Sequence, residues 1–370
     1  MSVYINYIGT ANPKHKIAQT QIAKFMANAQ EMDAEEQRKL EVLYRASAIQ
    51  TRYSVLADYE KQTANEYQFY PRSNNLEPFP TVGQRMQIYQ KEALPLCIAA
   101  IKDTFPDHYN YSQITHLVTV SCTGMYAPGI DIEIIQALGL PTSTQRTAIN
   151  FMGCYAAFNA IKTANQIVRS NPDALVLIVA VELCSLHFQK KKDTDTLLAN
   201  TLFGDGAGAL LISGKQGRGF NLRLDHFYCD LAIQGKQEMA WSINDFGFEM
   251  KLTAMVPEFI RFGIKELTDR LLAKLNLSVS DVDYFAIHPG GKKILRVIEE
   301  ELEIERSANR FAHEVLRNHG NMSSPTIIFV LKNLLAQLSK ENQGKNILSF
   351  AFGPGLTLES MLLTIVHRDY

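Results

Sequence analysis

The feature that most constrains the fold is an order of strand ends and glycine turns that recurs in both halves of the chain. An apolar segment that ends at Cys122 reappears as one that ends at His288, a shift of 288 − 122 = 166 residues. Gly153-Cys154 reappears as Gly320-Asn321, a shift of 321 − 154 = 167 residues. A shared order with a nearly constant offset indicates a duplicated structural unit.

The strands of this unit are continuously apolar. Residues 174–181 read Ala-Leu-Val-Leu-Ile-Val-Ala-Val, and residues 346–352 occupy the corresponding place in the second half. Strands without polar alternation are typical of sheets that helices cover on both faces. Residues 155–169, directly after Cys154, have the apolar spacing of a helix. Together these patterns predict an α/β fold built in layers.

We expect two like halves, residues 1–215 and residues 216–370, with a charged, glycine-marked connector at residues 215–250. Ser324 is expected to cap the helix that follows it, with Pro325 as the first helical residue. The other expected elements are strands at residues 1–9, 116–121, 209–212, 283–287 and 357–366, and helices at residues 17–30, 33–47, 81–105, 130–138, 292–302 and 325–338.

Composition excludes several classes of function. The 370 residues are 46% apolar and 20% charged, which is ordinary for a globular protein. A net charge of −1 gives no basic field for nucleic acid or an anionic membrane surface. The five cysteines include no C-x-x-C pair, so neither a disulfide framework nor a zinc site is expected. No signal peptide and no apolar run of membrane-spanning length is recognised, and a reducing, cytoplasmic location is expected.

Cys154 is the first candidate for chemistry. It lies at the start of the helix expected at residues 155–169, where unpaired N–H groups and the positive end of the helix dipole stabilise a thiolate. Taken alone, the commoner fate of such a residue is that of a small buried hydrophobe.

The duplication supplies companions for this cysteine. If the two units pack about a pseudo-twofold axis, Cys154 and Asn321 meet, with His288 at a strand end beside them. A paired histidine lowers the pKa of a thiol and keeps it as a thiolate at neutral pH. An amide and an imidazole N–H can both donate to a developing enolate or oxyanion. This set predicts acyl transfer onto cysteine, followed by decarboxylative formation of a carbon–carbon bond.

At these positions the sequence resembles the type III polyketide synthases, the chalcone synthase-like family. The motifs are Gly153-Cys154-Tyr155, Ile-His-Pro-Gly-Gly at residues 287–291, Gly-Asn-Met-Ser-Ser-Pro at residues 320–325 and Phe-Gly-Pro-Gly-Leu-Thr at residues 352–357, where Ala351 replaces a family glycine. Residues 49–53 and 202–207 also resemble the corresponding segments of this family. The resemblance implies a duplicated, thiolase-like αβαβα layered fold, a homodimer, and a buried cavity that the CoA arm reaches through a tunnel. It implies no metal and no redox cofactor.

The resemblance also implies roles for single residues. Cys154 would take the starter acyl group as a thioester, and His288 and Asn321 would hold the malonyl thioester, favour loss of CO2 and stabilise the enolate. Phe203 falls on the family's gatekeeper between tunnel and cavity, although by its own context it is a core aromatic before a turn.

The expected CoA-binding residues depart from the family pattern. Family members place two or three cations on the helix before the Arg-Tyr motif, whereas this chain offers Lys39 and Arg45, with neutral Val42 and Ala46 between them. Lys293, after the His-Pro-Gly-Gly turn, is expected to supply charge at the tunnel mouth, the alternative being a solvated helix face.

The expected cavity residues also depart from the plant enzymes. Cys184 and His187 stand where chalcone synthases have threonines, and His187 either shapes the cavity or is a satisfied core residue. Thr123 is expected to line the cavity. Ala127 stands where a methionine usually crosses into the partner's cavity, and Gly247 matches a glycine that leaves room for chain elongation.

The sequence therefore predicts an acyltransferase that condenses an acyl-CoA starter with malonyl-CoA and closes a resorcinol, phloroglucinol or pyrone ring. A fatty acyl or small aliphatic starter is favoured by the non-plant cavity loop. The alternatives are an initiating ketoacyl-ACP synthase that performs one condensation, and a non-catalytic thiolase-fold partner subunit. The lysine run at residues 189–193 is expected to be a solvated loop, with a docking patch for an acidic carrier protein as the alternative.

Overall fold

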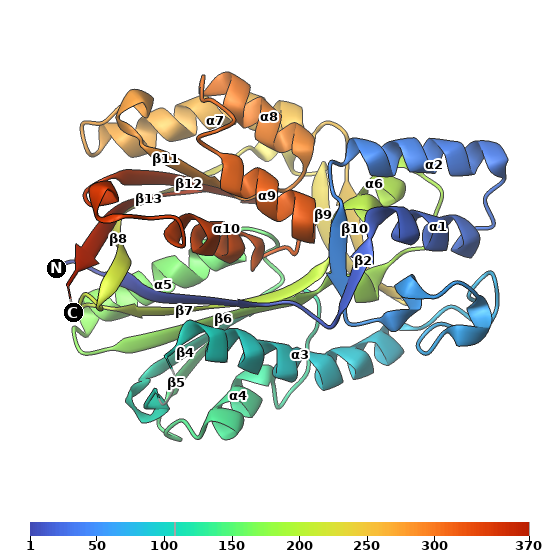
Figure 1. The fold of residues 1–370 in the computed structure, drawn as a ribbon, viewed down its shortest axis with the longest axis horizontal. Coiled ribbons are helices and arrows are strands. Elements are labelled where there is room, and N and C mark those ends of the chain that lie inside the picture. The colour runs from blue at the N-terminus through green and yellow to red at the C-terminus, as the bar shows by residue number, and fades with distance from the viewer. Residues whose placement is uncertain (107–108, 370) are drawn as a thin grey trace.

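A computed structural model describes residues 1–106 and 109–369, and in this part of the chain one nine-stranded sheet organises the molecule (Figure 1). Its order is β11-β12-β13-β8-β1-β7-β6-β4-β5. Its strands are β1 (Tyr4–Ala11), β4 (His116–Ser121), β5 (Gln145–Asn150), β6 (Leu175–Leu183), β7 (Asp205–Ser213), β8 (Gly219–Leu231), β11 (Tyr284–Ile287), β12 (Asn346–Gly353) and β13 (Thr357–Arg368). Two separate two-stranded antiparallel sheets are formed by β2 (His15–Ala18) with β3 (Thr51–Ser54) and by β9 (Met239–Asn244) with β10 (Gly247–Leu252).

The helices cover both faces of this sheet. They are α1 (Gln19–Ala29), α2 (Ala34–Ala46), α3 (Val82–Thr104), α4 (Ile130–Leu138), α5 (Ala156–Ser170), α6 (Thr194–Leu202), α7 (Val256–Ala273), α8 (Lys292–Glu301), α9 (Arg310–His319) and α10 (Thr326–Leu335). α6, α7 and α9 lie in segments for which no element was expected. α3 passes through Pro95 without a break. No helix of the described residues is long and apolar enough to cross a membrane.

The two halves of the sheet repeat one topology, which confirms the duplication. β4 runs parallel to β6, which is antiparallel to β7, which is antiparallel to β1. In the second half β11 runs parallel to β12, which is antiparallel to β13, which is antiparallel to β8. β1 and β8 join the halves through only two residue pairs, Tyr4 with Arg223 and Ile5 with Leu222.

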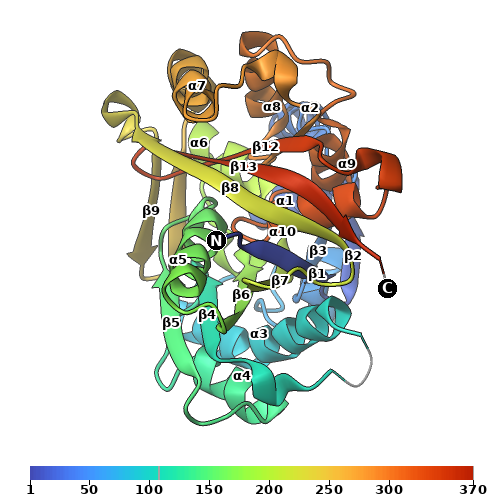
Figure 2. The ribbon, with the colours of Figure 1, turned by 90° about the vertical axis from the view of Figure 1, so that its left-hand side faces the viewer.

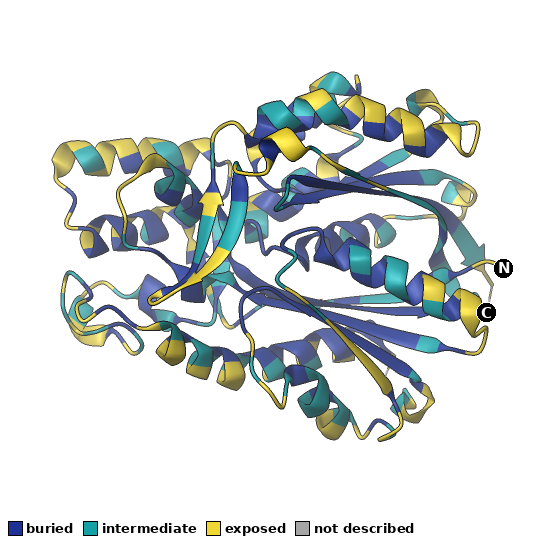
Figure 3. Cartoon of the chain, turned by 180° about the vertical axis from the view of Figure 1, so that it is seen from behind, coloured by how far each residue is buried: buried dark blue, intermediate teal, exposed yellow. Residues whose placement is uncertain are grey.

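Five layers result, as Figures 1 and 2 show. α5 and α10 lie between the two halves of the sheet, α3 and α4 cover the outer face of one half, and α7 and α8 cover the outer face of the other. Every residue of β4 and β7 is buried, and Figure 3 shows most of the central sheet in the buried colour, whereas the edge strand β5 is exposed. Continuous apolar strands and amphipathic helices therefore give the αβαβα layers predicted from the sequence.

The prediction of a connector at residues 215–250 is wrong. β8 lies inside the sheet and pairs with β13 from Gly219 to Leu231, and β9 and β10 form a hairpin. The charges that suggested a connector are satisfied within the sheet, since Arg223 Nε lies 2.5 Å from Asp225 Oδ1 and the Thr364 hydroxyl donates to Asp225 Oδ2 at 2.5 Å.

Candidate active site

A strained turn places Cys154 immediately before α5. Phe151 and Gly153 have φ values of 62° and 82°. A Cβ on Gly153 would lie 2.5 Å from Pro354 Cδ, so only glycine fits against the turn between β12 and β13. The thiol is therefore buried two residues ahead of Ala156, the first residue of α5.

Asn321 meets this thiol from the second half of the molecule. Cys154 Sγ lies 3.9 Å from both Oδ1 and Nδ2 of Asn321. Asn321 Oδ1 accepts a hydrogen bond from the Ser323 amide at 2.8 Å, and Nδ2 donates to the Gly290 carbonyl at 3.3 Å. These two bonds set the orientation of the side-chain amide, with its N–H group toward the loop that follows His288.

His288 stands at the end of β11 with its imidazole uncommitted. Its backbone N–H donates to the Phe350 carbonyl at 2.8 Å, which continues the ladder between β11 and β12. Its side chain is 1% exposed, and neither ring nitrogen has a hydrogen-bond partner within the described residues. Burial lowers the pKa of this imidazole to about 3, so the ring is neutral. A buried ring with two open nitrogens can accept and donate to a bound molecule.

The electrostatics of the thiol correct one prediction. Burial raises the pKa of Cys154 to about 11, against the opposing effect of hydrogen bonds from Ser323 and Asn321. The sequence predicted a thiolate held by a paired histidine. In this structure His288 makes no hydrogen bond to the sulfur, and desolvation outweighs the helix terminus, so the resting pair is a thiol and a neutral imidazole.

Glu182 is a site residue that the sequence analysis missed. It is the penultimate residue of β6, is fully buried, and accepts hydrogen bonds from the Cys122 amide at 2.9 Å, the Thr123 hydroxyl at 2.7 Å and the Ser324 hydroxyl at 2.7 Å. The Ser324 hydroxyl thus donates its hydrogen bond to Glu182 and does not cap α10, contrary to expectation. Burial raises the pKa of the carboxyl to about 7. A lone glutamate directly after an eight-residue apolar run was the available signal.

Two hollows lie near the thiol, one lined by Phe203 and the other by its neighbour Leu202. The inner cavity has an empty volume of about 840 Å³, part of it open to solvent, and is lined by Phe203, Gly153 and Ser323 among others. The outer groove is lined by Leu202 and by Gly290, beside the catalytic candidates. The backbone around Phe203 is tied to Asn321, because the Asn321 amide donates to the Leu202 carbonyl at 2.9 Å and the Gly204 amide donates to the Asn321 carbonyl at 2.9 Å.

The predicted cavity residues divide into two groups. Phe203, Thr123, Cys184 and His187 line the inner cavity, while Gly247 and Ala127 do not. Ala127 lines a separate surface hollow beside β5.

Gly247 supports the cavity wall from behind. With a φ of 111°, it lies where a Cβ would approach Arg85 Cδ at 2.9 Å and His187 Nδ1 at 3.2 Å.

His187 is both a cavity wall and a satisfied core residue. Nε2 donates to the Thr123 carbonyl at 2.7 Å, and Nδ1 accepts from the Phe248 amide at 3.0 Å. The ring stacks on Phe248 with centroids 4.3 Å apart and planes 7° apart. Burial lowers its pKa to about 3, so the ring is neutral and its tautomer is fixed.

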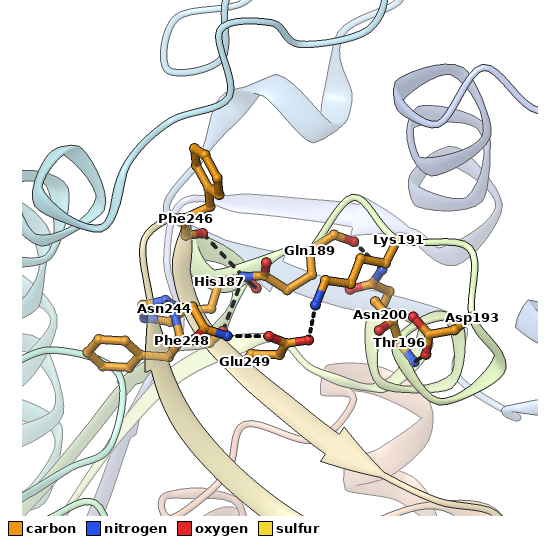
Figure 4. Close-up of polar contacts among 10 residues, drawn as sticks. All are labelled: His187, Gln189, Lys191, Asp193, Thr196, Asn200, Asn244, Phe246, Phe248 and Glu249. Atoms are coloured by element: carbon orange, nitrogen blue, oxygen red, sulfur yellow. Dashed lines mark hydrogen bonds and ion pairs between the residues drawn. The ribbon is translucent and has the colours of Figure 1, made fainter.

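Gln189 fastens this wall to the β9–β10 hairpin (Figure 4). Its Nε2 donates to the carbonyls of His187, Phe246 and Phe248 at 3.1, 3.2 and 3.3 Å, while Asn200 Nδ2 donates to the Gln189 carbonyl at 3.0 Å. The lysines that follow are ion-paired: Lys190 with Glu77, Lys191 with Glu249, and Lys192 with Glu36. The lysine run therefore offers no unpaired cations to a carrier protein.

The three predicted CoA-binding residues occupy different surfaces. Lys39 precedes Leu43, which lines the outer groove, by one helical turn and so lies on the same face of α2. Lys293 lines the outer groove itself, with Nζ 3.3 Å from Glu258 Oε1. Arg45 lines a different surface hollow, between α1 and α2. The described residues include no group of three or more histidine, cysteine or acidic side chains placed to hold a metal ion.

Comparisons with known proteins agree with this arrangement. Residues 2–216 match the N-terminal domain of the chalcone and stilbene synthases, and residues 228–367 match the C-terminal domain. The chain is 31% identical over 369 residues to the alpha-pyrone synthesis polyketide synthase-like Pks18 of Mycobacterium tuberculosis, covering 98% of this chain and 91% of that protein. It is 28% identical to a putative chalcone synthase of Bacillus subtilis, with 98% of both chains covered.

Solved structures show the same fold. The C-terminal type III polyketide synthase domain of Steely1, a type I/III hybrid from Dictyostelium, superposes with a TM-score of 0.89 at 29% identity, covering 99% of this chain and 100% of that domain. PKS-I from the brown alga Ectocarpus siliculosus superposes with a TM-score of 0.89 at 29% identity, covering 98% of this chain and 99% of that chain.

Proposed function

Because the chain belongs to the chalcone and stilbene synthase family of type III polyketide synthases, we propose that Cys154, His288 and Asn321 are its catalytic residues. The family's enzymes are acyltransferases that load a starter and condense it with malonyl-CoA. The observation that carries the assignment is the 3.9 Å contact between Cys154 Sγ and Asn321, together with the buried His288 imidazole, which has no hydrogen-bond partner among the residues that the structure describes.

The first step is acylation. Cys154 Sγ attacks the starter thioester carbonyl, the bond from that carbon to the CoA sulfur breaks, and the acyl group remains on Cys154. The thiol proton passes to His288, whose open ring nitrogen accepts it, and then to the departing CoA thiolate. Free thiol and neutral imidazole become an ion pair only as they react, and each charge then stabilises the other in the dry site.

The second step is condensation. An N–H of His288 and the Nδ2–H of Asn321 donate to the malonyl thioester oxygen, so that charge developing there is stabilised while CO2 departs. The resulting enolate carbon attacks the acyl carbonyl on Cys154, and the bond to sulfur breaks. The product is a β-ketoacyl-CoA, and Cys154 leaves as a thiolate, which takes up one proton from solvent water to regain the thiol for another round. Phe203, between the outer groove and the inner cavity, would separate incoming CoA thioester from growing chain.

The starter we propose is a fatty acyl or other aliphatic group. Part of the inner cavity is lined by apolar side chains of α1, α6 and their neighbours, namely Ile17, Ile22, Met26, Phe188 and Ala199. Such side chains suit an alkyl chain. A p-coumaroyl starter that outperforms every aliphatic CoA would contradict this assignment.

Mass spectrometry of the intact protein tests the assignment. Incubation with octanoyl-CoA should add one octanoyl group to the wild-type chain and none to Cys154→Ala, while malonyl-CoA extends the chain to cyclised products. The absence of an acyl adduct on Cys154 would refute the proposal and favour a non-catalytic subunit. Strict dependence on a malonyl carrier protein, with a single condensation, would indicate a ketoacyl-ACP synthase.

We also infer a homodimer that covers β5. This strand is the outermost in the sheet, pairs only with β4, and is exposed along nearly its whole length. An open edge strand is a hazard that proteins cover or block. Ala127 lies in the hollow beside it, which places that loop at the inferred contact. Sedimentation should give about twice the 41.6 kDa chain mass, and a monomer at micromolar concentration would contradict the inference.

A further inference from the structure

Cationic side chains without a carboxylate partner surround the C-terminal end of α2. Ala48, just beyond α2, is shared by two surface hollows. The cations that line these hollows, here called the arginine face, are Lys24, Arg45, Arg306, Arg310 and Arg317. None of them forms an ion pair within the part of the chain that the structure describes. Glu41 and Glu314 also line the hollows, so positive charge is in excess.

The arginine face adjoins the outer groove that leads toward Cys154. Ala46 and Ser47 line that groove, and the next residue, Ala48, lines both hollows of the arginine face. The Gln50 amide donates to the Arg317 carbonyl at 2.7 Å, which holds α9 against the end of α2. The unpaired positive charges of the arginine face thus lie at the edge of the outer groove.

The surface around the outer groove is apolar and weakly charged. Val42 of α2 is 62% exposed and Met255, before α7, is 51% exposed. The two lysines nearest the groove are already paired, Lys39 with Glu35 at 2.6 Å and Lys293 with Glu258 at 3.3 Å. Exposed apolar residues bordered by unpaired arginines are typical of a surface that a protein covers.

The spread of the charge favours a macromolecule over a nucleotide. Arg310 and Arg317 lie seven residues apart on α9, about 10 Å along its axis. Arg45 and Lys24 extend the face onto α2 and α1. Charges on three helices around a groove match an acidic protein surface better than one cluster of phosphates.

We propose that the arginine face docks an acidic acyl carrier protein, whose phosphopantetheine arm delivers the starter through the outer groove. This inference rests on the proposed function, because Cys154 must receive the acyl group. In the step, Cys154 Sγ bonds to the acyl carbon, the carbon–sulfur bond to the pantetheine arm breaks, and the arm leaves as a thiol with the proton. Malonyl units still arrive as malonyl-CoA.

The test compares three octanoyl donors at equal concentration: octanoyl carried by a phosphopantetheinylated acidic carrier protein, octanoyl-CoA and octanoyl-pantetheine. The rate of Cys154 acylation is followed by mass spectrometry. We expect the carrier to acylate Cys154 at least tenfold faster than the free pantetheine thioester. Salt should reduce this advantage, because exposed charges act mainly on association.

The double variant R306E/R317E should slow acylation by the carrier about tenfold and leave acylation by octanoyl-CoA within twofold. Arg218→Glu, on an exposed loop between β7 and β8, is the matched control and should change neither rate. Equal rates for carrier and pantetheine would overturn the inference. So would equal slowing of CoA and carrier by the double variant, which would assign the arginines to CoA. Failure of all three donors would instead refute the proposed function.

Discussion

Replacing Glu182 by glutamine should change the free energy of unfolding in a pH-dependent way. The variant's free energy of unfolding, compared with that of the wild type, should be more favourable at alkaline pH than at acidic pH. Glutamine keeps the shape of the protonated carboxyl. Its oxygen can accept from the Cys122 amide and the Thr123 hydroxyl, as Oε2 does now, and its N–H can donate to Ser324, whose hydroxyl can rotate to accept. The substitution therefore removes the ionisation with little loss of hydrogen bonding.

The magnitude follows from the pKa of the buried carboxyl. Burial raises the pKa of Glu182 from 4.5 to about 7, a difference of 2.5 that corresponds to about 3 kcal/mol. Because the folded state holds this proton more tightly than the unfolded chain, the stabilisation is complete below pH 4.5 and is lost as the pH rises through about 7. Between pH 5 and pH 8 the wild type should lose about 2–3 kcal/mol through this group.

Urea unfolding at pH 5 and pH 8, at one protein concentration, measures the effect. The difference in unfolding free energy between Glu182→Gln and wild type should shift by about 2–3 kcal/mol in favour of the variant between pH 5 and pH 8. Asp205, whose pKa burial raises to about 6, contributes equally to both proteins and cancels. Glu341→Gln, at an exposed site, controls for the loss of one carboxylate. Parallel pH dependence in variant and wild type would show that Glu182 is ionised throughout and refute the reasoning.

Three further predictions concern the site and its wall. In His288→Ala, iodoacetamide labelling of Cys154, followed by peptide mass spectrometry, should titrate at the same pH as in wild type, near the value of about 11 that burial imposes, because His288 makes no hydrogen bond to the sulfur. Labelling of the wild type at a lower pH than the variant would show that His288 stabilises the thiolate and would contradict this. Asn321→Ala should slow malonyl-CoA decarboxylation about 10²–10³-fold, measured as CO2 release, and an unchanged rate would remove Asn321 from its role. Gly247→Ala should lower the unfolding free energy by about 1–3 kcal/mol, because its φ of 111° and the approach to Arg85 both oppose a side chain; full stability in urea would contradict this.

The layered fold and the meeting of Cys154 with Asn321 could be predicted because both follow from backbone repetition. A duplicated unit places equivalent turns about a common centre, whatever side chains they carry. The offset of 167 residues between Cys154 and Asn321 became a contact of 3.9 Å. Where polar residues satisfy one another inside a strand, as Arg223 and Asp225 do in β8, the sequence pattern alone was misleading.

Side-chain electrostatics could not be predicted, because desolvation depends on the whole surrounding structure. The helix terminus ahead of α5 was expected to lower the pKa of Cys154, yet complete burial raises it. Glu182 showed no motif, and its importance lies in hydrogen bonds from residues 122, 123 and 324, which are far apart in the chain. Gly247 fits a family pattern, but only the structure shows that it supports His187 from outside the cavity.

The duplication also explains which residues are left for chemistry. Cys122 and His288 occupy equivalent strand ends, but their side chains are used differently. Cys122 Sγ accepts the Gly153 amide at 3.0 Å and so holds the strained turn that presents Cys154. His288 has no such task, and both of its ring nitrogens remain open. An unsatisfied buried polar group is costly, so its retention at the centre of the molecule is best explained by a substrate that completes its hydrogen bonds.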